Sequence, residues 1–181
     1  LFSWIGGSGR VSNIVIKNTS VTGSIRAAGL SGVNDGKVTN ATVTGQITGS
    51  DDVGGIIASN NGELQTSAAR ITVSAMGSQL GGLVGSNLGK IISSSADSQI
   101  NGSVSLSNGA SYVGGVTGLN QGYIRDVSVK TAVNGTSSVG GIAGWNIRGD
   151  VINSSVTGSV NGSTKVGGLV GRNQNATIAY S

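Results

Sequence analysis

The acidic side chains are the first place to look for chemistry in this 181-residue chain, which has seven carboxylates and neither Cys nor His. Without thiols or imidazoles, thiolate or imidazole metal sites, Ser-His-Asp triads, cysteine nucleophiles and disulfides are excluded. Glycoside hydrolysis needs two carboxylates about 5 to 10 Å apart. Two pairs are candidates, Asp51 with Asp52 and Asp35 with Glu63. We expect all four carboxylates to solvate the protein surface, so we predict no catalytic, cofactor-binding or metal-binding residues.

Three of the six aromatic residues are candidates for ligand contact. Sugar-binding surfaces use exposed aromatic platforms, and Tyr123 and Trp145 fall near corresponding turns of neighbouring repeats. Tyr112 borders the one irregular repeat. We therefore predict that any ligand contact involves Tyr112, Tyr123 and Trp145.

The charge pattern gives no sign of a nucleic acid or a membrane as partner. The net charge of +4 comes from 11 basic and 7 acidic residues spread along the chain, with no run of like charges. A nucleic-acid surface would cluster its basic residues. No apolar run approaches the roughly 20 residues that span a bilayer. We expect neither nucleic-acid binding nor membrane insertion.

An internal repeat dominates the sequence. The strings VGGIIASNNGEL, LGGLVGSNLGKI, VGGVTGLNQGYI, VGGIAGWNIRGDV and VGGLVGRNQNATI are one motif, and weaker copies precede them. The apolar residue that closes each copy recurs at spacings of 27, 26, 27, 33, 27 and 27. These register residues are Val11, Val38, Leu64, Ile91, Ile124, Val151 and Ile178. The extra residues of the long repeat predict a loop insertion at about 102–111.

The segments between motifs alternate apolar and polar residues with a period of two, which favours β-strands. The alternation breaks once per repeat at a short polar residue, which predicts a corner at Asn13, Asn40, Thr66, Ser93, Asp126 and Asn153. One repeat cannot bury its apolar row alone, whereas stacked repeats can. The sequence therefore predicts an all-β, single-chain parallel β-solenoid (β-helix) of one domain, 1–181. We expect about 27 residues per coil, six to seven coils, and right-handed winding.

Two further rows of residues recur with the same spacing as the register residues. Asparagines recur where each motif turns, followed in most copies by a glycine, at Asn34, Asn60, Asn87, Asn120, Asn146 and Asn173. Asn and Gly tolerate the left-handed conformation that turns use, and stacked amides can bond one another as a ladder. A row of asparagines that binds sugar or an ion is the alternative. The residues just before the register share no chemistry and should face water; they are Arg10, Lys37, Glu63, Lys90, Tyr123, Asp150 and Thr177.

The strings VGGLVGRN, LGGLVGSNLGKI and NSSVTGSVNG resemble the GLUG repeat of large secreted bacterial proteins, which include immunoglobulin A peptidases and filamentous-haemagglutinin-like adhesins. In such proteins the repeats form a passenger or stalk, and any protease domain is separate. The resemblance implies a location outside the cell or on the bacterial surface, with flanking domains in the same polypeptide. Because the chain starts and stops inside a repeat, we expect it to be a fragment of a longer array.

The function expected from these observations is that of a structural or adhesive passenger segment, a rigid stalk or a multivalent contact surface, and not an enzyme. Its partner would be a glycan or matrix protein of a host or neighbouring cell. One alternative is a carbohydrate- or matrix-binding module that uses the aromatic residues and the loop at 102–111. A polysaccharide-active enzyme and an ice-binding solenoid are further alternatives.

Overall fold

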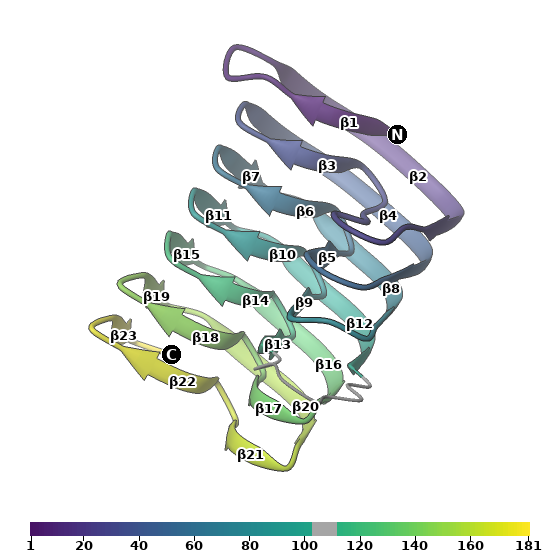
Figure 1. The fold of residues 1–181 in the computed structure, drawn as a ribbon. Coiled ribbons are helices and arrows are strands. Elements are labelled where there is room, and N and C mark those ends of the chain that lie inside the picture. Colours follow the sequence, from purple (N-terminus) through teal and green to yellow (C-terminus); the bar gives the residue numbers. More distant parts are fainter. Residues whose placement is uncertain (103–111) are drawn as a thin grey trace.

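The computed structural model describes residues 1–102 and 112–181. Figure 1 shows a stack of similar coils, and the prediction of an all-β parallel β-solenoid is confirmed. The stack makes about six turns, with about 27 residues between most stacked strands. Within the described ranges, no helix could cross a membrane. The predicted insertion at about 102–111 lies outside the described residues apart from Gly102.

The seven-stranded sheet takes one short strand from each coil. These strands carry the second half of the glycine motif and end at the recurring asparagine or one residue after it, except in the first coil, where Ile5 pairs with Asn34. In order across the sheet they are β1 (Phe2–Ile5), β3 (Ser31–Asn34), β6 (Ile57–Asn60), β10 (Val84–Asn87), β14 (Thr117–Asn120), β18 (Ala143–Ile147) and β22 (Val170–Gln174).

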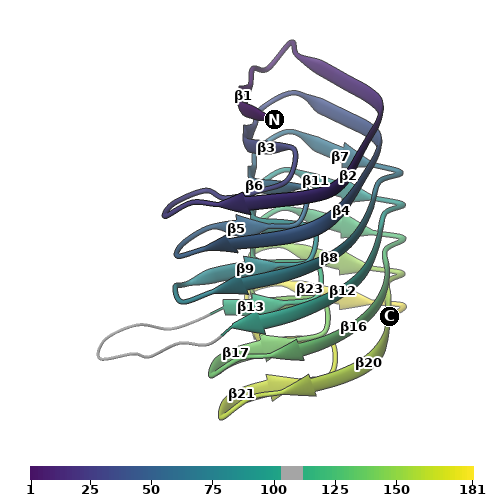
Figure 2. The same cartoon turned by 90° about the vertical axis from the view of Figure 1, so that its right-hand side faces the viewer.

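The eleven-stranded sheet forms the broad face of the solenoid, where Figure 2 shows the long strands stacked in order. Its long strands are β2 (Arg10–Thr22), β4 (Lys37–Gly49), β8 (Ala68–Ala75), β12 (Ser95–Gly102), β16 (Ser128–Asn134) and β20 (Ser155–Asn161). Its short strands pair with one another in a row, and the first of them, β7, pairs with the start of β4. They are β7 (Glu63–Gln65), β11 (Lys90–Ile92), β15 (Tyr123–Arg125), β19 (Asp150–Ile152) and β23 (Thr177–Ala179).

A five-stranded sheet completes the coil, and the pairings of all three sheets are parallel throughout the described chain. It contains β5 (Val53–Gly54), β9 (Gln79–Gly81), β13 (Tyr112–Gly114), β17 (Ser137–Gly140) and β21 (Thr164–Gly167). Because these strands are only two to four residues long, the chain turns immediately into the next strand of the seven-stranded sheet.

The core consists of inward-facing aliphatic rows, as the period-two alternation predicts. In β8, Ala69, Ile71, Val73 and Ala75 are buried and the residues between them face outward. The register residues pair coil on coil, and Val38, Leu64, Ile91, Ile124 and Val151 are fully buried. Their terminal counterparts are more exposed, Ile178 by 38%, because the end coils have a neighbour on one side only.

The predicted corner is confirmed by the backbone. Asn13, Asn40, Thr66, Ser93, Asp126 and Asn153 all adopt positive φ, between 47° and 55°. Most residue types avoid this left-handed region, whereas Asn and Asp tolerate it through local hydrogen bonds. The corner therefore changes the direction of the chain once per coil, inside β2 and β4 in the first two coils and between the short strand and the following long strand in the later ones.

Candidate functional site

The recurring asparagines form one continuous amide ladder inside the solenoid. Each Nδ2 donates a hydrogen bond to the Oδ1 of the next coil at 2.8 Å, from Asn34 through Asn60, Asn87, Asn120 and Asn146 to Asn173. The first five side chains are fully buried. From Asn60 to Asn146 each amide is buried and bonded on both sides by its neighbours, so this part of the row offers no surface to a sugar or an ion.

The turn chemistry expected for this row is wrong in one respect. None of the six asparagines adopts positive φ, and the glycine that follows is needed for a different reason. A Cβ on Gly62 would clash with the carbonyl oxygen of Gly36 in the coil before, and a Cβ on Gly89 would clash with that of Gly62. The glycine column therefore exists because the turns stack in close contact.

The first candidate carboxylate pair is engaged by neighbouring coils. Asp51 Oδ1 accepts hydrogen bonds from the backbone N–H and the hydroxyl of Ser78, both at 2.8 Å. Asp52 lies 4.0 Å from Arg26 Nε. Burial raises the pKa of Asp52, and the Arg26 charge offsets part of this rise. These contacts tie one coil to the next, as a structural role requires.

The second candidate pair is engaged in the same way. Asp35 accepts hydrogen bonds from Asn61 Nδ2 at 2.7 Å and Trp4 Nε1 at 2.6 Å. These two donors lower the pKa of Asp35 because they stabilise its charged form. Glu63 forms an ion pair with Lys37, with 2.7 Å between Oε1 and Nζ. Each carboxylate thus has its own partner on an adjacent coil.

Two of the three predicted aromatic residues meet, and they are not the expected two. Tyr112 and Trp145 lie with ring centroids 5.0 Å apart at an interplanar angle of 49°. The guanidinium of Arg172 lies 4.6 Å from the centroid of Trp145. We call Tyr112, Trp145 and Arg172 the aromatic corner. Among the described residues, the ring contact of Trp145 is with Tyr112, and Tyr123 lies on β15 of the eleven-stranded sheet.

The aromatic corner forms where strands of two sheets come close. Trp145 lies on β18 of the seven-stranded sheet, and Tyr112 lies on β13 of the five-stranded sheet, one coil earlier. Trp145 pairs directly with Arg172 of β22. Among the residues that the structure describes, the buried indole Nε1 of Trp145 has no hydrogen-bond partner.

A groove runs along the turns between the seven-stranded sheet and the short strands of the eleven-stranded sheet, at one edge of the stack in Figure 1. Its volume is about 690 Å³. One wall is the row before the register, Arg10, Lys37, Glu63, Lys90, Tyr123 and Asp150; the glycine column forms the floor; and the opposite wall includes Asn61, Leu88, Gln121 and Arg148. We call this the axial groove.

The row before the register was expected to face water without a shared role. It does lie at the surface, but the stacking of turns lines it up as one wall of a groove. Leu88 and Arg148 on the opposite wall, and Arg172 of the aromatic corner, are residues that sequence reasoning missed. Aligning the residues that follow each recurring asparagine would have pointed to the opposite wall.

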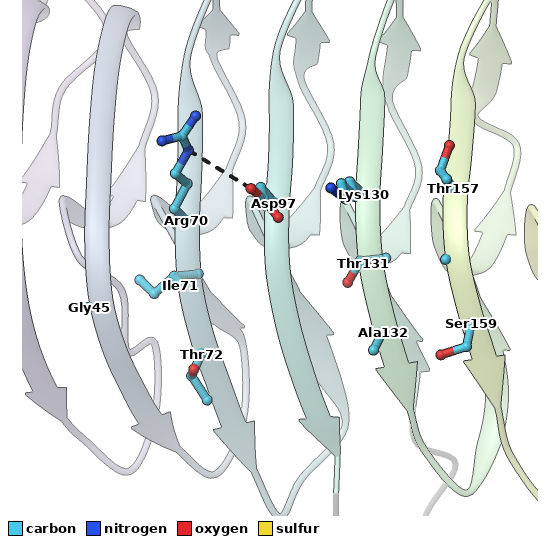
Figure 3. Close-up of a pocket in the computed structure, with 11 residues that line it drawn as sticks. Gly45, Arg70, Ile71, Thr72, Asp97, Lys130, Thr131, Ala132, Thr157 and Ser159 are labelled. Atoms are coloured by element: carbon cyan, nitrogen blue, oxygen red, sulfur yellow. Dashed lines mark ion pairs between the residues drawn. The ribbon is translucent and has the colours of Figure 1, made fainter.

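The outer face of the eleven-stranded sheet carries a shallower hollow of about 460 Å³ (Figure 3). Arg70, Asp97 and Lys130 lie in register across three coils, with Asp97 between the two cations. Arg70 Nε is 4.0 Å from Asp97 Oδ2, and both side chains are more than half exposed. Exposed pairs of this kind contribute about 0 to 1 kcal/mol.

The donor set offers little to a metal ion. Among the residues that the structure describes, no group of three or more acidic, His or Cys side chains is placed to hold one. The two candidate binding surfaces are the aromatic corner and the axial groove.

Comparisons with known proteins place the repeat in a recognised class. Residues 135–161, which span one coil from β17 to β20, match the family described as the GLUG motif. A segment of 61 residues, 34% of the chain, is 34% identical to halomucin from Haloquadratum walsbyi (strain DSM 16790 / HBSQ001). No solved structure matches the chain.

The chain matches 1% of the length of halomucin, so the matched segment is a small part of that protein. The GLUG match covers one coil and the halomucin match about a third of the chain, so both similarities concern the repeated part of the sequence.

Proposed function

We propose that this chain is a segment of the exported part of a cell-surface adhesin. It acts as a stiff rod that holds a binding region away from the cell and presents its own flank for weak, repeated contacts. The observation that carries this proposal is the unbroken stacking of the coils, with the amide ladder running through all but the first of them. Continuous backbone and side-chain bonding along one axis gives a rod its stiffness.

The proposal assigns no reaction to the chain. The four carboxylates that form the two candidate pairs bond to neighbouring coils, and glycoside hydrolysis would need two of them free and facing one substrate. Mixing the protein with a broad set of polysaccharides and measuring new reducing ends tests this assignment. Release of new ends would overturn it.

Two measurements test the surface role. Antibodies raised against the purified chain should label intact cells of the source organism, and labelling only after permeabilisation would overturn the proposal. The purified chain should also show saturable binding to one class within a panel of immobilised glycans and matrix proteins. An unrelated solenoid of similar net charge is the control. If the chain binds no better than this control, its flank is not adhesive and the chain acts as a spacer only.

A second candidate function is a binding module with one specific site at the aromatic corner. The buried, unpartnered Nε1 of Trp145 favours it, because a buried donor without a partner costs about 1 to 3 kcal/mol and a ligand acceptor would recover part of this. Under this alternative, Trp145→Ala should abolish binding to the panel while Tyr123→Ala leaves it unchanged. Equal binding by the wild type and Trp145→Ala would exclude the corner as the site.

A further inference from the structure

The axial groove combines charge with apolar contact in a hollow of about 690 Å³. It contains residues from six successive coils, from Gly7 to Asp150, so it is long and narrow along the solenoid axis. At about 4.8 Å per coil, five coil-to-coil steps extend over roughly 24 Å. Such a shape suits an extended polymer better than a compact small molecule.

The groove has an excess of positive charge that the chain does not neutralise. Four cations, Arg10, Lys37, Lys90 and Arg148, face two acids, Glu63 and Asp150, which leaves a net charge of four minus two, or +2. Glu63 is already paired with Lys37 at 2.7 Å. Arg10, Lys90 and Arg148 belong to none of the ion pairs of the described residues. These three cations are available to an anionic ligand.

The three unpaired cations, Arg10, Lys90 and Arg148, lie on the first, fourth and sixth coils. Lys90 and Arg148 are two coils apart, which is about 9.6 Å along the axis at about 4.8 Å per coil. This separation is close to the length of one disaccharide unit in an extended polysaccharide. A polymer with one anionic group per disaccharide would therefore meet Lys90 and Arg148 with successive units.

The uncharged lining suits a sugar more than a nucleotide. Leu88 is 53% exposed and Tyr123 is half-buried, so both present apolar surface to the groove. The amide of Gln121 can donate to and accept from hydroxyl groups. A nucleic-acid groove would need a denser basic track and several stacking aromatics, whereas this groove has a net +2 charge and one aromatic ring.

We propose that the axial groove binds a linear anionic polysaccharide, which lies along the solenoid axis with its carboxylate or sulfate groups beside Lys90, Arg148 and Arg10. Tyr123 and Leu88 cover the apolar faces of the sugar rings between these groups. This inference rests on the proposed function, in which the flank of the rod makes the contacts, and it names the ligand class for that flank.

The test uses hyaluronan oligosaccharides, which carry one carboxylate per disaccharide, and chondroitin sulfate as the sulfated arm. Binding to the whole chain is measured by calorimetry in the wild type, Lys90→Glu, Arg148→Glu and Lys130→Glu. Lys130 is the matched control, because it is an exposed lysine on the outer face of the eleven-stranded sheet and belongs to none of the described ion pairs. Circular dichroism verifies that every variant keeps the wild-type strand content.

We expect the dissociation constant to rise about tenfold in Lys90→Glu and in Arg148→Glu, and less than about twofold in Lys130→Glu. Added salt should weaken wild-type binding, and neutral chitin oligosaccharides should not compete. Equal or tighter binding of hyaluronan identifies carboxylate groups as sufficient, and tighter binding of chondroitin sulfate, which carries a sulfate in addition to its carboxylate, shows that sulfate contributes; either supports the proposal.

Three results would overturn the inference: no binding to either polysaccharide, equal losses in Lys90→Glu and Lys130→Glu, or equally tight binding of oligothymidylate or polyglutamate. The last would show a general polyanion surface. Failure here is distinct from failure of the proposed function, since cell-surface labelling is independent of groove binding. If antibodies label intact cells but the chain binds neither polysaccharide, the proposed surface rod stands and the proposed binding site in the axial groove is rejected.

Discussion

The turn after each recurring asparagine has a uniform inner side and a varied outer side. On the inner side, the same residue recurs in six coils and bonds its neighbour at 2.8 Å each time. On the outer side, the wall of the axial groove changes from arginine to lysine, glutamate, tyrosine and aspartate. A buried amide must both donate and accept along the stack, whereas water satisfies any outward side chain. The fold therefore constrains one side of the turn and leaves the other free for recognition.

Removing one member of the inner ladder should give the largest effect on stability. Asn87→Ala removes the ladder acceptor of Asn60 Nδ2 and the ladder donor to Asn120 Oδ1, both in buried positions. These two atoms keep only longer bonds of 3.3 to 3.4 Å, from Asn60 to the carbonyls of Gly62 and Lys90, and to Asn120 from the Gly122 N–H. Two ladder bonds at about 0.5 to 1.5 kcal/mol each, together with the cavity that the truncated side chain leaves, should cost about 2 to 4 kcal/mol. Urea denaturation followed by circular dichroism measures it.

The matched control for the ladder is Asn161→Ala, which removes an exposed asparagine that also bonds an asparagine one coil away, at 3.1 Å. We expect a change within about 0.5 kcal/mol, as for most surface substitutions. Equal losses in Asn87→Ala and Asn161→Ala would show that burial of the ladder does not matter.

A second prediction concerns the floor between the two sides of the turn. Gly89→Ala places a methyl group against the Gly62 carbonyl of the preceding coil and should cost about 1 to 3 kcal/mol. Gly7→Ala is the control, since a Cβ there meets nothing within 4 Å. Thermal denaturation of both variants distinguishes them, and a stable Gly89→Ala would contradict the close stacking of the turns.

A third prediction extends the ladder by one residue. Ile5 stands where an asparagine would continue the row, and the buried Oδ1 of Asn34 has no partner among the described residues. Ile5→Asn supplies a donor to that oxygen and loses apolar burial, so the two terms of about 1 to 3 kcal/mol offset each other. We expect a stability within about 1 kcal/mol of the wild type.

The control for this extension is Ile91→Asn, which places the same amide at a fully buried register position inside the aliphatic core. It should cost more than about 3 kcal/mol, because the buried amide gains no partner and the core loses volume. Similar costs for Ile5→Asn and Ile91→Asn would show that the free oxygen of Asn34 cannot be satisfied from the first coil.

The smallest effect is a pH dependence with opposite signs at two aspartates. The lowered pKa of Asp35, on the outer side of the turn, means that its stabilising contribution is lost as the pH falls. The raised pKa of Asp52 means that its contribution is present at low pH and is lost as the pH rises through the pKa in the folded state.

Relative to the wild type, Asp52→Asn should therefore be more favourable at pH 7 than at pH 3, by less than about 1 kcal/mol. Asp35→Asn should be more favourable at pH 3 than at pH 7. Urea denaturation at the two pH values measures both differences. The same pH trend in the two variants would contradict the assigned causes, hydrogen bonding at Asp35 and burial at Asp52.

Much of the fold follows from the repeat. The period-two rows predict the buried aliphatic side chains, and the break in alternation predicts the corner at which Asn40 and Asp126 take positive φ. The reason for the turn glycines was not predictable from one copy of the motif. A clash between Gly89 and the Gly62 carbonyl exists only when two turns stack, so local propensity suggests positive φ where the real constraint is contact between coils.

The sequence by itself determined which residues stack along the axis, because equal repeat lengths bring like positions into register whatever the cross-section of the coil. It thus predicted the row Asn34 to Asn173 and the row before the register. Only the tertiary structure decided which rows meet across the coil. Tyr112 and Trp145 come together because the short five-stranded sheet turns sharply into the seven-stranded one, and Lys90 faces Leu88 and Arg148 across a groove because the turns stack closely. These contacts between rows depend on the angles between the sheets. Those angles arise from packing around the whole coil, so the sequence of one repeat does not reveal them.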